Sequence, residues 1–189
     1  MKQIIVNART TEKRIAVIEE KKLLDFMIIR PVKVAQAGQI YLAQIEKIDR
    51  KINACFVTLG KEKGFLHLDD IPEDAMKTQG GKLLVQVVRP GSKTKLPLVS
   101  GMLELTGEQL VYIYGKSYVS VSKRIGDERK EELIREVKPH LQQAEAVILR
   151  SKAETSSTES LVQELTERRQ FLLDLVSQSQ NKKKTWFIA

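Results

Sequence analysis

Apolar and polar residues alternate in short runs along the first half of the chain, a pattern that is typical of β-strands. Residues 1–35 hold three such runs, and the third ends at an Arg-Pro pair. Beyond them, glycines and glycine pairs separate the runs, as they do between the short strands of a barrel. We therefore expect a β meander over residues 1–35 and an OB-type β-barrel over residues 36–105.

The second half of the chain mixes strand runs with helical periodicity. Two strand runs, at 109–114 and 117–122, precede a helix that Asp127 can cap. A third strand run follows, and then the stretch Ser156-Ser-Thr-Glu159, a capping box that predicts a second helix. The order β-β-α-β-α predicts a compact α+β unit over residues 106–189. We expect the chain as a whole to have an α+β fold.

Charge and composition narrow the kinds of partner. The net charge is +8 and the pI is near 9.5, which favours a polyanionic partner. No apolar run approaches the roughly 20 residues of a membrane-spanning helix, and none resembles the core of a signal peptide. We therefore expect a cytoplasmic protein that does not associate with a membrane.

Cysteine and histidine are scarce, which limits metal and redox chemistry. The single cysteine, Cys55, excludes an internal disulfide and a Cys-rich zinc site, and its apolar neighbours favour a buried thiol. The two histidines, His67 and His140, lie far apart in the sequence. We expect neither a metal site nor another cofactor in this chain.

Residues 38–71 carry the chemistry that points to a function. Aromatic residues lie there beside lysines: Tyr41, Phe56 and Phe65 among the former, and Lys47, Lys51, Lys61 and Lys63 among the latter. Rings stack on bases and lysines meet phosphates, which is the combination that single-stranded RNA requires. We therefore predict single-stranded RNA as the partner.

The same segment, GQIYLAQIEKIDRKINACFVTLGKEKGFLHLDDI, closely resembles an S1 domain, an OB-fold RNA binder, in the form found in the ribonuclease E/G family. Three further stretches match this family in order: the opening meander, Ser-Lys-Arg-Ile at 122–125 and Val-Ile-Leu-Arg-Ser at 147–151. The resemblance implies that the meander is the first part of an RNase H-like subdomain into which the S1 domain is inserted. It also implies that the α+β unit senses a 5′-monophosphate on RNA.

The resemblance assigns three RNA-contacting residues in the S1 part. Phe56 and Phe65 fall on aromatic positions, and Lys95 falls on a basic one. A ring can stack on any base, and this contributes about 1–3 kcal/mol per base. The alternative is that both phenylalanines belong to the core of the barrel.

The resemblance also implies a 5′-phosphate site in the α+β part. Arg150 and Ser151 match an Arg-Thr pair of the family that grips the phosphate. A guanidinium offers a bidentate fork and a hydroxyl completes the cradle. The alternative is that Arg150 is an ordinary surface arginine at the end of a strand.

Four more positions of that site follow from the resemblance. Gly107 and Val111 fall on positions where family members make backbone or packing contacts. Lys123 and Arg124 fall on positions where the family has two arginines. A lysine lacks the planar fork of an arginine, so we expect Lys123 to weaken the recognition of a phosphate.

We identify no catalytic residue in the sequence. The resemblance implies RNA cleavage by two Mg²⁺-binding aspartates on a later DNase I-like domain, followed by a zinc-binding link, and the sequence ends at Ala189 before either. Mg²⁺ is thus expected for the full-length family enzyme. The carboxylates that are present, such as Asp69-Asp70 and Glu131-Glu132, form no converging set of the kind that metal-assisted cleavage needs.

We interpret the chain as the RNA-binding N-terminal part of a ribonuclease E/G-like endoribonuclease of RNA processing or decay. One alternative is a stand-alone, non-catalytic S1 protein, and another is a nuclease whose sequence was recorded short. A third is an unstable remnant in which residues 1–35 lack the sheet that covers them. Exposed strand edges and apolar patches would then lead to self-association.

Overall fold

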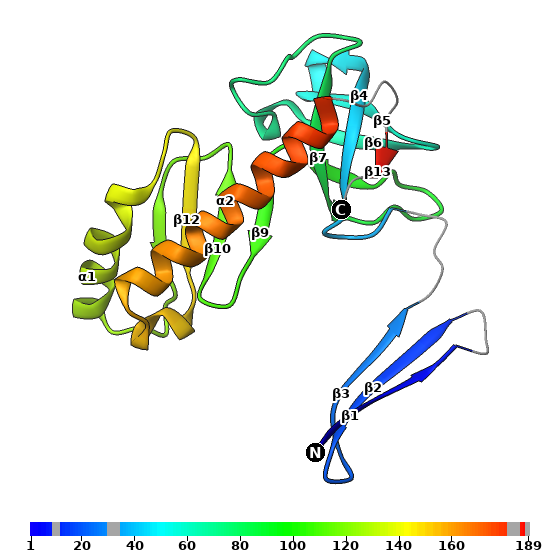
Figure 1. Cartoon of the computed structure of the whole chain (residues 1–189). Coiled ribbons are helices and arrows are strands. Elements are labelled where there is room, and N and C mark those ends of the chain that lie inside the picture. The colour runs from blue at the N-terminus through cyan, green and yellow to red at the C-terminus, as the bar shows by residue number, and fades with distance from the viewer. Residues whose placement is uncertain (9–11, 30–34, 181–185, 188–189) are drawn as a thin grey trace. The chain divides into compact units, whose positions relative to one another are not determined.

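The computed structural model describes residues 1–8, 12–29, 35–180 and 186–187 of the chain. The chain divides into two compact units, Met1–Val34 and Ala35–Ala189. Figure 1 labels many of the helices and strands of both units. The second unit contains the barrel and the two helices.

The first unit is an antiparallel sheet of three strands in the order β1-β2-β3. The strands are β1 (Lys2–Asn7), β2 (Lys13–Glu19) and β3 (Lys22–Ile29). Glu20 and Lys21 both have positive φ, as the tight hairpin turn between β2 and β3 requires. The expected β meander is confirmed.

Apolar side chains lie on both faces of this sheet. Val6 and Ile15 are cross-strand partners on one face, and Ile5, Ala16 and Phe26 are partners on the other. Ile5, Val6 and Phe26 are each at least 50% exposed. Because both faces of this sheet carry apolar side chains, neither face is suited to contact with water.

The second unit begins with a closed barrel of five strands. The main ladder runs β13-β4-β5-β6-β8-β7, and an additional β4–β7 pairing closes it. The strands are β4 (Ile40–Asp49), β5 (Ala54–Leu59), β6 (Glu62–His67), β7 (Lys82–Arg89), β8 (Leu98–Ser100) and the short outer strand β13 (Trp186–Phe187). Two 3₁₀ turns, η1 (Arg50–Ile52) and η2 (Leu68–Asp70), join barrel strands. This is the OB-type barrel that the sequence predicts.

Apolar residues of alternating strand positions fill the barrel. Ile45, Val57, Leu66, Val85 and Val99 are at most 1% exposed and belong to one core cluster. The expected buried thiol lies in this cluster too, and burial raises the pKa of Cys55.

A four-stranded sheet with two helices follows the barrel. Its order is β11-β12-β10-β9, and β11 runs parallel to β12. The strands are β9 (Glu104–Thr106), β10 (Leu110–Tyr114), β11 (Val119–Val121) and β12 (Glu145–Leu149). The helices are α1 (Asp127–Val137), α2 (Thr158–Gln180) and the 3₁₀ turns η3 (Lys138–His140) and η4 (Ser151–Thr155). The predicted α+β fold is confirmed.

Two details differ from the sequence analysis. The end of the 36–105 range expected for the barrel forms two strands, β8 and β9, and only β8 belongs to the barrel, whereas β9 belongs to the four-stranded sheet. The Oγ of Ser157 accepts the N–H of Ser160 at 3.3 Å, so Ser157 caps α2. The Ser156 hydroxyl instead donates to the carbonyl of Lys152, because Ser156 lies in the turn that ends η4.

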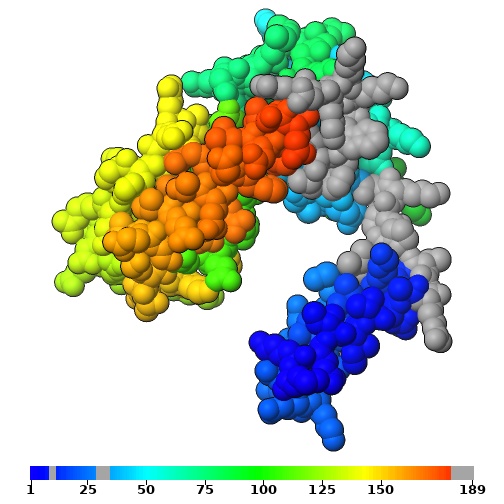
Figure 2. Space-filling model, in the orientation of Figure 1, coloured from blue at the N-terminus to red at the C-terminus, as the bar shows by residue number. Residues whose placement is uncertain are grey.

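Helix α2 is shared by the two parts of the second unit, the barrel and the α+β part. In Figure 1 it runs from the four-stranded sheet to the barrel. Figure 2 shows it as a continuous orange ridge on the surface. Leu161 and Leu165 are buried in the same core cluster as Leu172 and as Ile40 of the barrel strand β4. The barrel and the α+β part therefore share one apolar core cluster.

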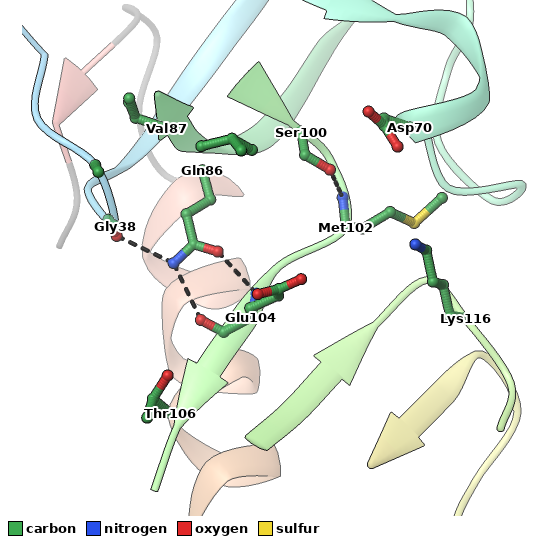
Figure 3. A pocket seen from close by; sticks show the side chains of 11 residues that line it. Gly38, Asp70, Gln86, Val87, Ser100, Met102, Glu104, Thr106 and Lys116 are labelled. Carbon is green, nitrogen blue, oxygen red and sulfur yellow. Dashed lines mark hydrogen bonds between the residues drawn. The ribbon is translucent and has the colours of Figure 1, made fainter. Parts of the chain in front are cut away.

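A glutamine links the two parts a second time. The Gln86 side chain on β7 donates to the carbonyls of Gly38 and Glu104 and accepts the N–H of Glu104 at 2.8 Å (Figure 3). The first residue of β9 is thus hydrogen-bonded to a barrel strand.

Candidate nucleic-acid interface

The barrel carries a row of cross-strand partners on its outer surface. Strand register pairs Lys47 with Phe56, Phe56 with Phe65, Phe65 with Leu98, and Leu98 with Arg89. Because cross-strand partners point to the same face, the five side chains form one line, which we call the barrel row. Its two ends are cationic and its middle is apolar and aromatic.

The rings of the barrel row lie outside the core. Phe56 is half-buried, whereas its neighbours Cys55 and Val57 are fully buried. The Phe56 and Phe65 ring centroids are 5.9 Å apart, in an edge-to-face arrangement. Phe65 is half-buried as well. Partly exposed rings in contact are suited to stacking with further aromatic groups, including bases.

A hollow of about 290 Å³ lies beside Phe65. Its lining includes His67, Arg89 and Lys95. The ring of His67 lies 5.0 Å from that of Phe65, again edge to face. Lys95 is exposed, and neither it nor Arg89 forms an ion pair within the described residues. The hollow therefore combines rings with cations that are available to an anion.

The other basic residues of the segment differ in their surroundings. Lys63 forms an ion pair with Glu46 at 2.7 Å, and Glu46 also accepts the hydroxyl of Thr58. Both donors hold the pKa of Glu46 below its ordinary value. Lys51 and Lys61 are exposed on turns. Tyr41 lies on β4, where its hydroxyl donates to Gln39.

A second polar surface lies where β11 and β12 end. The two strands are parallel, so their last residues reach the same edge of the sheet, and Ser122 donates its N–H to Leu149. The hydroxyl oxygens of Ser122 and Ser151 are 3.1 Å apart. Lys123 and Arg124 follow Ser122 and are exposed. Two predicted phosphate-binding segments therefore lie side by side.

Arg150 joins this edge to the turn between β9 and β10. Its Nη1 donates to the carbonyl of Gly107 at 2.5 Å, and its backbone N–H donates to the carbonyl of Gln109 at 2.8 Å. Arg150 as a whole is exposed. We call Gly107, Ser122, Arg150 and Ser151 the Arg150 cluster.

The predicted site residues are thus distributed over these two surfaces. Phe56, Phe65 and Lys95 lie on the barrel, and Gly107, Arg150 and Ser151 lie in the Arg150 cluster. Val111 is a half-buried residue in the middle of the sheet, paired with Thr106 and Ile148. The prediction named Lys47 only as one of several phosphate-binding lysines and Ser122 only as part of the 122–125 stretch, and it did not name Leu98, His67 or Arg89 as neighbours of the rings. His67 could have been found, since it lies two positions from Phe65 along a strand.

Two further hollows have mixed charge. One of about 420 Å³ includes Asp70, Glu104 and Lys116 in its lining (Figure 3). Another of about 770 Å³ has three carboxylates and two lysines in its lining: Asp69, Glu73, Asp74, Lys77 and Lys116. Within the described ranges, no three His, Cys, Asp or Glu side chains are grouped to hold a metal ion. Nor is any described helix long and apolar enough to cross a membrane.

The fold and these surfaces define the class of protein. An OB-type barrel is joined to an α+β unit, and the barrel carries the barrel row of rings and cations. Comparison with known proteins gives the family. Residues 104–189 match the profile of the "Ribonuclease E/G family". The chain is therefore homologous to the ribonuclease E/G family, as the resemblance predicts.

Individual relatives agree with the family profile. Ribonuclease G of Salmonella typhimurium is 30% identical over 154 residues, which cover 71% of this chain and 32% of that protein. Ribonuclease G of Haemophilus influenzae is 29% identical over 182 residues, 86% of this chain and 37% of that protein. Ribonuclease E of Nostoc sp. is 29% identical over 144 residues, 69% of this chain and 21% of that protein. The chain thus spans about a third of the ribonuclease G relatives and a fifth of the ribonuclease E relative.

Proposed function

We propose that this chain binds single-stranded RNA in an RNA-processing role like that of ribonuclease E/G proteins. The barrel row would hold bases in the manner of an S1 domain. The Arg150 cluster would hold a 5′-monophosphate. In terms of domains, residues 1–35, 36–105 and 106–189 would correspond to the RNase H-like part, the S1 domain and the 5′ sensor.

The barrel row is the observation that carries this proposal. Phe56 and Phe65 are central in a line that ends in Lys47 and Arg89. Stacked rings accept every base, and flanking cations meet the phosphates on either side. Such a surface favours RNA of any sequence over a folded protein partner. Lys95, at the adjoining hollow, supplies a further phosphate contact.

The Arg150 cluster supports the 5′-end part. Arg150 uses one N–H for Gly107 and keeps a fork for an anion, and the hydroxyls of Ser122 and Ser151 lie together near the same edge. Lys123 and Arg124 add two exposed charges. A terminal phosphate carries more negative charge than an internal one, so such a cluster favours the 5′-monophosphate over a 5′-hydroxyl.

These contacts would contribute to catalysis elsewhere in a ribonuclease E/G-like protein. Binding energy from remote parts of a substrate can position the bond that reacts. Mg²⁺ belongs to that cleavage step, and we assign it no ligand here. A cytoplasmic location is part of the same proposal.

Fluorescence anisotropy with a short unstructured RNA tests the proposal. The RNA carries either a 5′-monophosphate or a 5′-hydroxyl, at one stated salt concentration. Phe65→Ala should lower the affinity for both RNAs about tenfold or more, because the stacking of one base is lost. Arg150→Ala should remove the preference for the monophosphate and leave the 5′-hydroxyl RNA unaffected.

Matched controls are Phe171→Ala and Arg135→Ala, which remove an exposed ring from α2 and an exposed arginine from α1. Both should bind like the unchanged protein. Equal binding of the two RNAs would leave an S1-type RNA binder without a 5′ sensor. No effect of Phe65→Ala would refute the barrel row.

We further propose that residues 1–34 mediate self-association. Both edge strands of this sheet, β1 and β3, lack a partner among the described residues of their unit, and both faces expose apolar side chains. A second copy offers the same edges and faces. Sedimentation velocity over a concentration series should then show species heavier than one 21.5 kDa chain. A single monomer at every concentration would contradict the idea.

A further inference from the structure

Glu164 is a buried carboxylate next to the Arg150 cluster. It lies on α2 and is 7% exposed. Its two oxygens accept the backbone N–H groups of Glu108 at 2.5 Å and Gln109 at 2.9 Å. Ser160, one helical turn earlier, is hydrogen-bonded to the Gln109 side chain. Burial of a carboxylate is costly unless donors or cations compensate it. Here two backbone donors do so, together with the Arg168 guanidinium, whose Nη2 lies 3.9 Å from Oε1 of Glu164.

The turn has no room for a side chain where it meets this carboxylate. A Cβ added to Gly107 would overlap with Oε1 of Glu164. The glycine therefore serves the close approach of Glu164. The sequence resemblance associates Gly107 with the phosphate, but its lack of a side chain has this separate structural reason.

Arg150 holds the same turn from its other side. Glu164 binds the N–H groups of residues 108 and 109, whereas Arg150 binds the carbonyls of Gly107 and Gln109. Since the carbonyl of Gly107 and the N–H of Glu108 belong to one peptide group, Glu164 sets the direction in which that carbonyl points. The carbonyl in turn fixes the Arg150 guanidinium.

We propose that Glu164 is a positioning residue for anion binding by Arg150. It orients the peptide between Gly107 and Glu108, so that the Arg150 guanidinium is held with its free N–H groups toward the incoming anion. This inference rests on the proposed 5′-phosphate function and adds its orienting residue. Glu164 itself does not contact the phosphate, because its oxygens are buried against the turn.

The test uses Glu164→Gln and a matched control, Glu167→Gln. Both change a carboxylate on α2 to an amide, but Glu167 is exposed and contacts Gln163. The amide nitrogen of a glutamine cannot accept a backbone N–H, so Glu164→Gln breaks one of the two bonds to the turn. The binding of 5′-monophosphate and 5′-hydroxyl RNA is measured for each variant.

We expect Glu164→Gln to lower the ratio of the two affinities about tenfold, as for the loss of one hydrogen bond that orients a charged group. Its affinity for the 5′-hydroxyl RNA should stay unchanged, which a general loss of folding would not allow. Glu167→Gln should keep the full ratio. An unchanged ratio in Glu164→Gln would overturn the inference.

A readout without RNA separates this inference from the proposed function. In ¹H–¹⁵N spectra, Glu164→Gln and Gly107→Ala should both shift the Arg150 Nε–H signal, because each displaces the same carboxylate. If the unchanged protein shows no preference for the monophosphate, the 5′-end proposal fails. The Arg150 signal then still tests whether Glu164 positions Arg150. The absence of a shift in both variants would refute that role.

Discussion

Arg169→Ala tests how a buried ion pair stabilises the α+β part. Arg169 donates to the two carboxylate oxygens of Glu145 at 2.6 and 2.7 Å and to the carbonyl of His140 at 2.8 Å. Glu145 is only 4% exposed and also accepts the Tyr112 hydroxyl and the Gln142 N–H. The variant leaves this carboxylate buried without a cation.

The expected loss follows from that burial. Removal of one partner from a buried pair typically costs about 3–5 kcal/mol. The Arg169 side chain is 17% exposed, so water partly compensates and we expect the lower end, about 3 kcal/mol. Lys130→Ala is the control, because its partner Asp127 is 96% exposed and such surface pairs contribute little. Urea unfolding at pH 7 measures both variants.

The pH dependence provides a second signature. Burial raises the pKa of Glu145, but the hydrogen bonds from Arg169, Gln142 and Tyr112 outweigh it, so the pKa lies below its ordinary 4.5. The pair therefore stabilises the protein above about pH 4.5, and this stability is lost as the pH falls through the lowered pKa. Without Arg169, the effect of burial on the pKa of Glu145 is less compensated, so this carboxyl takes up its proton at higher pH.

The difference in unfolding free energy between the unchanged protein and Arg169→Ala should thus be largest near neutral pH and shrink in acid. Equal unfolding midpoints at pH 7 would refute the reasoning, as would a difference that grows toward pH 4.

Two further predictions concern the barrel and the meander. Lys95→Ala should reduce the slope of log affinity for single-stranded RNA against log salt by about 0.7, as for one lost phosphate contact. Lys63→Ala is the control and should change the slope little, because Lys63 already pairs with Glu46. Equal slopes in titrations of both variants would count against a phosphate contact at the hollow beside Phe65. Removal of residues 1–34 should leave the thermal unfolding of the remainder unchanged, because both buried core clusters consist of residues from Ala35 onward; a large fall of the melting temperature in calorimetry would contradict this.

The strands of the barrel could be predicted from the sequence, but the barrel row could not. Alternation shows that Phe56 points away from Cys55 and Val57, yet it does not show which side faces the core. The row also depends on β-bulges: the register shifts between Ile45 and Lys47 in β4, and again before Arg89 in β7. A bulge moves every later residue relative to its partner strand, and no local pattern records it.

The Arg150 cluster was predictable only through family resemblance. Ser122 and Ser151 come together because β11 and β12 run parallel in neighbouring positions, which is a property of sheet order. Glu164 gave no signal at all. It lies beside Leu165 in a helical pattern, and an acidic residue there is ordinarily solvated. Its buried partners are backbone groups of Glu108 and Gln109, which every sequence possesses.

Helix α2 has a consequence for how this architecture can be inherited. Leu161 near its start and Leu172 farther along belong to a core cluster that also takes Ile40 from the first barrel strand. A recombination event that moved the barrel alone into another gene would leave this helix behind and expose part of the cluster. The barrel and the α+β unit therefore complete each other's core, and we expect them to be inherited as a pair.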